Sequence, residues 1–163
     1  MSAQVTIVEK IKASIQNSVF VPRQETVNGQ VVTVYDPLPV YYHDEPTLNL
    51  LTSSMSFPCA LLQLLSSGRI DRTGPQKREA VTAAVFFVEP SQFDFDAEAN
   101  EVIIDRCKTN AMTWLSSLNT SGLLEASGLV RTSRVYDRYD DILTGFGVSV
   151  DLTELDGLCI DNP

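Results

Sequence analysis

The chain has few histidines and cysteines, two residue types that catalysis and metal binding commonly use. It contains one histidine, His43, and three widely spaced cysteines, Cys59, Cys107 and Cys159, with no CxxC pair. This arrangement predicts neither a disulfide framework nor a zinc site, and apolar neighbours favour buried free thiols. A G-x-S-x-G nucleophile elbow, a phosphate-binding P-loop and an HExxH helix are also missing. We therefore expect a protein that is not an enzyme, with no catalytic, cofactor-binding or metal-binding residues.

Basic residues and long hydrophobic runs are scarce too. The 12 Lys and Arg residues face 21 Asp and Glu residues, and the net charge of −9 argues against specific binding of nucleic acid or of an anionic membrane. Arg69, Arg72, Lys77 and Arg78 could form a local basic patch, although a solvated loop is the favoured interpretation. No stretch is long enough to span a membrane, and no signal peptide is recognisable at the N-terminus, so a cytoplasmic protein is expected.

The length and composition fit a single domain over residues 1–163. Apolar residues at helical spacing predict an N-terminal helix that begins after Ser2 and ends before Pro22. Asn28-Gly29 between β-branched residues predicts a β-hairpin with a type I′ turn over residues 26–35. Residues 40–57 are only partly periodic, so residues 21–57 as a whole are expected to form a hairpin followed by an extended arm.

The rest of the chain predicts a sheet and one long helix. Residues 58–65 and 78–88 are apolar runs typical of buried strands, joined by a loop over residues 66–76. An apolar stripe through Trp114 predicts a helix over residues 97–118 that lies across the sheet. Strands are expected over 128–138 and 141–153, around an acidic turn. The predicted fold is α+β: a mostly antiparallel sheet of four or more strands, packed against two helices, with an additional N-terminal hairpin or arm.

The last strand alternates clearly between two kinds of residue. Its even positions, including Phe146, Val148 and Val150, are expected to face the core, and its odd positions to form a nearly bare row. Glycine in a strand invites close approach of another backbone. The candidate subunit interface is therefore Gly145, Gly147 and Ser149, together with Tyr41 and Tyr42 of an arm over residues 36–57 that is expected to reach a neighbouring subunit.

Four other groups have a functional interpretation that a structural one outweighs. His43 could act as a base but is better explained as a structural or surface residue. Asp94 and Asp96 could bind a cation, although they also suit the start of the following helix. The third group is an acidic turn, explained by hydrogen bonds of its side chains to the local backbone: Asp137, Arg138, Asp140 and Asp141. The fourth is an aromatic set, explained by core packing: Phe86, Phe87, Phe93, Phe95 and Trp114.

The order of these segments resembles a known family. An N-terminal helix, an FPCALL strand, an AAVFF strand, an acidic helix with LSSL and the closing hairpin LVRTSRVYDRYDDILTGFGVSVDL are similar to small proteins of prophage tail gene clusters. Their layout resembles that of the tail terminator, or tail completion, proteins of long-tailed phages. The resemblance covers roughly residues 1–155, is one of pattern rather than of an invariant motif, and departs from the compact family layout over residues 21–57.

The resemblance implies a non-enzymatic virion protein. Such proteins form a ring, commonly a hexamer, that caps the tail tube at the head–tail junction and contacts tube or neck proteins. It would assemble in the host cytoplasm and end in the virion tail, and an acidic ring would let DNA slide through its lumen. Two alternatives stay open: a stand-alone adaptor module that binds another protein, and a metal-dependent hydrolase that uses Asp94 and Asp96.

Overall fold

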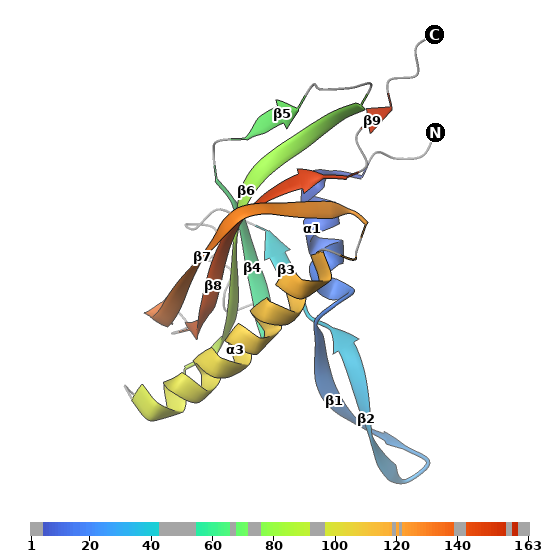
Figure 1. The fold of residues 1–163 in the computed structure, drawn as a ribbon. Coiled ribbons are helices and arrows are strands. Elements are labelled where there is room, and N and C mark those ends of the chain that lie inside the picture. Colours follow the sequence, from blue (N-terminus) through green and yellow to red (C-terminus); the bar gives the residue numbers. More distant parts are fainter. Residues whose placement is uncertain are drawn as a thin grey trace.

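A computed structural model of the chain shows a curved sheet, two helices on one of its faces and a projecting hairpin (Figure 1). It describes residues 5–42, 55–65, 68–71, 76–91, 97–118, 120, 122–138, 143–155 and 158–159. The elements in chain order are α1 (Ile7–Gln16), β1 (Phe20–Val27), β2 (Gln30–Pro37), β3 (Val40–Tyr42), β4 (Cys59–Leu64), β5 (Arg69–Asp71), β6 (Gln76–Pro90), α3 (Ala97–Leu118), β7 (Leu124–Arg138), β8 (Leu143–Glu154) and β9 (Leu158–Cys159). The α+β class is confirmed.

The main sheet has the strand order β3-β4-β6-β8-β7, and β5 and β9 pair with the first part of β6. Its pairs are antiparallel except β3 with β4, which is parallel, so the sheet is mixed but mostly antiparallel. The sequence did not predict β3 or β5. Each has three residues, too few for a period of two to be recognised, and β5 lies inside the predicted loop over residues 66–76.

Helix α1 begins later than the sequence predicts. Its N-cap is Thr6 rather than Ser2, which lies outside the described residues. The backbone N–H of Glu9 donates to Thr6 Oγ1 at 3.2 Å, and the N–H of Thr6 donates to Glu9 Oε2 at 2.8 Å. This reciprocal capping box satisfies two backbone donors at the helix start, so Thr6 sets where α1 begins. The buried face of the helix consists of Ile7, Ile11, Ser14 and Ile15.

Helix α3 has the predicted bounds and lies across the sheet as expected (Figure 1). Trp114 is fully buried, its ring centroid lies 6.2 Å from that of Phe87 on β6, and its indole N–H donates to Ser14 Oγ at 2.9 Å. That single side chain therefore connects α3 with the sheet and with α1. The predicted orientation of β8 is also confirmed, because Phe146, Val148 and Val150 join the same core.

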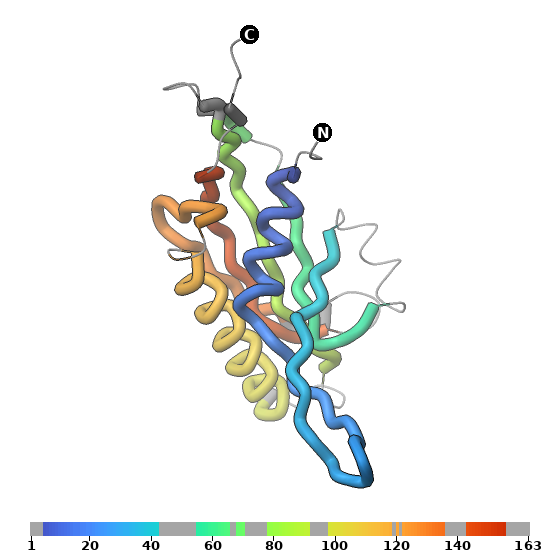
Figure 2. The backbone as a smooth tube through the Cα atoms, turned by 90° about the vertical axis from the view of Figure 1, so that its right-hand side faces the viewer, coloured from blue at the N-terminus to red at the C-terminus, as the bar shows by residue number. Residues whose placement is uncertain are grey.

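Strands β1 and β2 form a two-stranded ribbon that leads away from the body (Figures 1 and 2). The turn has positive φ at Asn28 (51°) and Gly29 (79°), as the predicted type I′ turn requires. The ribbon is longer than residues 26–35, since pairing runs from Phe20 with Pro37 to the turn. Its base is fixed by the fully buried Leu38, whose N–H donates to the carbonyl of Val19 at 3.0 Å.

Candidate assembly surfaces

The row expected to be bare on β8 is buried. Gly145 and Gly147 are both buried and Ser149 is half-buried. A Cβ at Gly145 would lie 1.9 Å from the carbonyl oxygen of Phe87, and one at Gly147 would lie 2.6 Å from Ser133 Oγ. Neighbouring strands of the same chain therefore occupy the space that the sequence analysis reserved for a partner. The expectation of an open row was therefore wrong at Gly145 and Gly147, whereas a subunit contact at the candidate residues stays a prediction.

The face of the sheet opposite the helices carries a second, smaller core. Leu143 of β8 packs there with three buried residues, Val88 of β6 and Cys59 and Leu61 of β4. Tyr41 packs against this cluster, and its hydroxyl accepts a hydrogen bond from the Ser56 N–H at 3.0 Å. Tyr41 thus has a role inside the chain, while Tyr42 is exposed. Of the five residues proposed for the interface, Tyr42 is the most exposed, at 40%.

The candidates for chemistry mostly lie outside the part of the chain that is described. This holds for His43, for Asp94 and Asp96, and for Asp140 and Asp141 at the turn. Among the residues that are described, no three His, Cys, Asp or Glu side chains gather in a way that could hold a metal ion. Nor is either described helix sufficiently long and apolar to cross a membrane.

The aromatic residues are divided between the two faces of the sheet. Phe87 and Trp114 lie in the main core, while Phe86 packs against the smaller one, so these three form no common box. Phe93 and Phe95 lie outside the described residues. The favoured interpretation as core packing is therefore confirmed for the three that the structure places.

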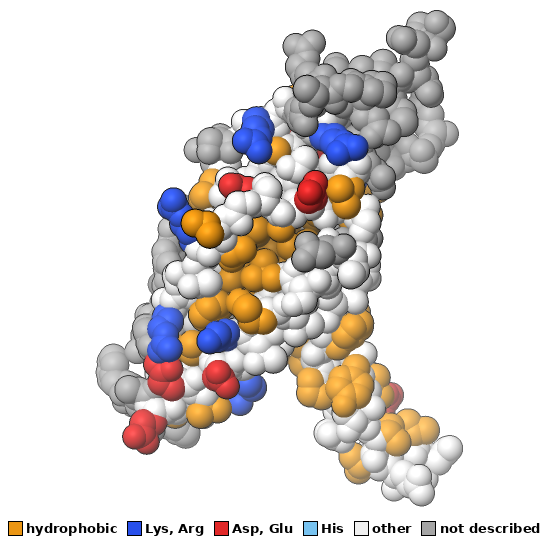
Figure 3. All heavy atoms as spheres, in the orientation of Figure 1, with side chains coloured by type: hydrophobic (Ala, Val, Ile, Leu, Met, Phe, Trp, Pro, Cys, Tyr) orange, Lys and Arg blue, Asp and Glu red, His pale blue; other side chains and the backbone are white. Residues whose placement is uncertain are grey.

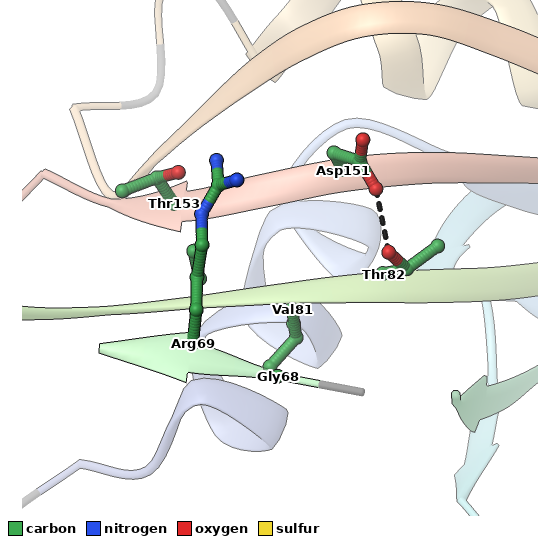
Figure 4. Close-up of a pocket in the computed structure, with 7 residues that line it drawn as sticks. Gly68, Arg69, Val81, Thr82, Asp151 and Thr153 are labelled. Atoms are coloured by element: carbon green, nitrogen blue, oxygen red, sulfur yellow. Dashed lines mark hydrogen bonds between the residues drawn. The ribbon is translucent and has the colours of Figure 1, made fainter. Parts of the chain in front are cut away.

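A shallow cleft of about 270 Å³ lies where β5, β6 and β8 meet (Figure 4). Arg69 stands over it from β5, and the Thr82 hydroxyl donates to Asp151 Oδ1 at 2.5 Å. Arg78 lies on the strand paired with β5, with Asp71 as its partner in register. One arginine beside a carboxylate that already has a partner defines no class of ligand, so we assign no function to this cleft.

The buried thiols match the expectation of free cysteines. Cys59 and Cys107 are both unpaired and buried. Burial is the largest cause that raises the pKa of each thiol, from 9.0 to about 12. For Cys107 the carboxylate of Glu89, 3.8 Å from its Sγ, raises the pKa further. Because the thiolate is the nucleophile, neither residue is set up as a reactive cysteine.

This chemistry predicts slow thiol modification of the folded protein. In Cys159→Ser protein, which retains Cys59 and Cys107, we expect almost no reaction with a thiol reagent at pH 8 in native buffer and complete reaction of both thiols in denaturant. Absorbance of the released chromophore reports both rates. Fast labelling of either thiol in native buffer, with the circular dichroism spectrum unchanged, would show that the site is open to solvent.

The hairpin has two chemically different faces, because side chains alternate along each strand. On one face lie Arg23, Glu25 and Asp36, and Arg23 donates to Asp36 at 2.7 Å. The opposite face, here called the uncharged face, carries no ionisable acid or base apart from one tyrosine: Phe20, Pro22, Gln24 and Thr26 of β1, and Val31, Thr33, Tyr35 and Pro37 of β2. Phe20, Val31 and Tyr35 are 48%, 70% and 65% exposed. Large exposed apolar side chains grouped in this way are typical of an interaction surface.

A second open surface lies along β7. In the described part of the chain this strand pairs with β8 alone, so it is an edge of the sheet. A bulge interrupts its pairing between Ser127 and Arg131, and within it Leu129 is 91% exposed. Beyond the bulge, residues 131–135 pair regularly with β8. Figure 3 shows hydrophobic side chains gathered between β7 and α3 and also along the hairpin, on the same side of the molecule.

The cleft between α3 and β7 has a volume of about 290 Å³ and an apolar floor. Ile104 and Met112 of α3 line it together with Phe146 of β8. Its rim is charged, and there Arg134 of β7 forms an ion pair with Glu101 of α3. An apolar floor with a polar rim is the composition of many protein interfaces. The sequence analysis missed both this cleft and the hairpin face.

Comparison with known proteins gives no further assignment: no family model matches the chain, and a search of curated proteins gives no match. The functional argument therefore depends on the two exposed surfaces described above.

Proposed function

We propose that the chain is a non-enzymatic structural protein that assembles into a ring, in the manner of a phage tail terminator. The observation that carries this proposal is the presence of two different open β-surfaces in one chain, the uncharged face of the hairpin and the edge strand β7. Two different surfaces that bind each other produce head-to-tail contacts, which close into a ring when the rotation between subunits allows it.

The remaining parts of the proposal come from the resemblance of the closing hairpin and its preceding segments to tail terminators. The ring, commonly a hexamer in that family, caps the tail tube at the head–tail junction and contacts tube or neck proteins. The net charge of −9 supports a lumen that does not retain DNA, because phosphates are repelled by carboxylates.

Tube polymerisation tests this function directly. If the neighbouring genes encode a tail tube protein, it is polymerised with and without this protein, and tube lengths and ends are examined by electron microscopy. We expect shorter tubes with a ring at one end. Unchanged tube lengths and bare ends would contradict a terminator. A gene cluster with no tail genes would also count against it and would favour the alternative of a protein-binding adaptor.

A further inference from the structure

The outer edge of β2 is an unusually open pairing surface. Residues Gln30–Asp36 contain no proline, and Val31, Val32 and Tyr35 are all exposed. In the described part of the chain β2 pairs with β1 alone, and such a β-branched segment on an open edge is a template for pairing with another strand. The outer edge of β1 is a poorer template, because Pro22 has no N–H to donate. A two-stranded ribbon is also marginally stable alone, so pairing through β2 would stabilise it.

The edge of β7 is complementary to this ribbon in charge. Residues 131–135 form a regular segment without proline or acidic residues, and they carry Arg131 together with Arg134, which pairs with Glu101 of α3. The hairpin carries one arginine against two carboxylates, Glu25 and Asp36. The two elements thus have opposite charge in a chain whose net charge of −9 would otherwise make two copies repel each other.

The ribbon cannot reach β7 of its own chain. Its base is held by Val19 and Leu38 in the main core, and Phe20, Val21 and Pro22 line a cavity with Arg106 of α3. From there the ribbon leads away from the body, while β7 lies on the far side of the sheet from β3 (Figures 1 and 2). The β7 edge that it meets must therefore belong to a second copy.

We propose that β2 of one copy pairs with the outer edge of β7 of the next copy and extends its sheet. The uncharged face of the hairpin then covers the cleft between α3 and β7, with Val31 and Tyr35 over the floor formed by Ile104, Met112 and Phe146. Main-chain hydrogen bonds hold the two strands together, and the apolar contacts with the cleft determine which face of the hairpin turns towards α3, as in other cases of strand addition. This inference rests on the self-assembly in the proposed function, and it specifies which two strands form the contact between copies.

Cross-linking between two variants tests this contact in the full chain. Thr33 lies on the uncharged face of β2, and Thr132 lies on the helix-side face of β7, where it pairs with Val148. Strands that pair in one sheet bring side chains on the same face together. Thr33→Cys protein is mixed with Thr132→Cys protein or with Arg134→Cys protein, whose cysteines lie two residues apart on the same face of β7. All variants are made in a Cys159→Ser background, and the mixtures are oxidised with a copper catalyst. The matched control is Val32→Cys, which is exposed on the opposite face of the same strand.

We expect disulfide-linked dimers in the mixture of Thr33→Cys with at least one β7 variant, and several-fold fewer with Val32→Cys or with Thr33→Cys alone. Equal cross-linking of Thr33→Cys alone would overturn the proposal in favour of β2 pairing with β2 about a two-fold axis. No cross-link in any mixture would also overturn it. Light scattering on the same samples distinguishes failure of this contact from failure of the proposed function. Oligomers without cross-links would mean that the ring assembles through another surface, whereas monomers would count against both proposals.

Discussion

Replacing Gly145 with alanine is expected to destabilise the protein by about 3 kcal/mol or more, at the upper end of the usual cost of overpacking a core. The added methyl group would lie 1.9 Å from the carbonyl oxygen of Phe87 and 2.9 Å from the Cα of Val88. Both are backbone atoms, so no side-chain rotation relieves the overlap and β6 must move away from β8. Urea unfolding followed by circular dichroism measures the change.

Two other glycines provide the controls for this substitution. At Gly147 the new methyl group would meet side chains, Ser133 Oγ at 2.6 Å and Phe86 Cδ1 at 2.7 Å, which can shift in part. At Gly68 it would lie 3.4 Å from the carbonyl oxygen of Ala80. We expect the loss of stability to fall in the order Gly145, Gly147, Gly68. If Gly145→Ala is as stable as Gly68→Ala, β6 and β8 do not approach each other as described.

Replacing Trp114 with alanine is expected to cost about 3–5 kcal/mol, because a fully buried indole leaves a large cavity. Ser14→Ala is expected to cost about 1–3 kcal/mol, since it removes the acceptor of the buried indole N–H. The control on the same helix is Val102→Ala, which truncates a side chain that is 59% exposed and should change stability by about 0.5 kcal/mol or less.

Denaturant titration followed by far-ultraviolet circular dichroism measures all three variants, including the one that lacks the only tryptophan. The comparison of Ser14→Ala with Val102→Ala is decisive for the connection between α1 and α3. Equal stability of those two variants would show that the hydrogen bond from Trp114 to Ser14 does not hold the helices together.

The sequence predicted well the elements that have long periodic patterns. Helix α3 has the expected bounds, the hairpin turn at Asn28-Gly29 has the expected conformation, and the even positions of β8 face the helices. These features depend on local backbone preference or on burial of one face, both of which a single sequence records.

The odd positions of β8 were misjudged for a physical reason. Glycine in a strand indicates that something approaches closely, but the sequence does not say whether that neighbour belongs to the same chain. Here it does, since Phe86 and Phe87 of β6 occupy the space beside Gly147 and Gly145. Gly147→Glu is therefore expected to destabilise the monomer, because its side chain would overlap Ser133 and Phe86.

The sequence analysis missed the hairpin surface because residues of two different strands form it together. Val31, Thr33 and Tyr35 form one uncharged face only when β2 is aligned with Phe20 and Pro22 of β1. The sequence predicted the turn correctly but assigned the role of an arm to residues 36–57, much of which lies outside the described residues. Listing each strand's outward residues across the predicted hairpin would have revealed the uncharged face.

The central claim, that copies of this chain assemble through the hairpin, is tested most directly by mass in solution. Light scattering is measured over a range of protein concentrations for wild type, Val31→Glu and Val27→Glu. Both valines are exposed near the hairpin turn, 70% and 46% respectively, but they lie on opposite faces of the ribbon. We predict a ring-sized mass for wild type and Val27→Glu and a monomer mass for Val31→Glu, with equal circular dichroism spectra. Monomers of all three proteins up to millimolar concentration, or equal masses of the two variants, would contradict the account.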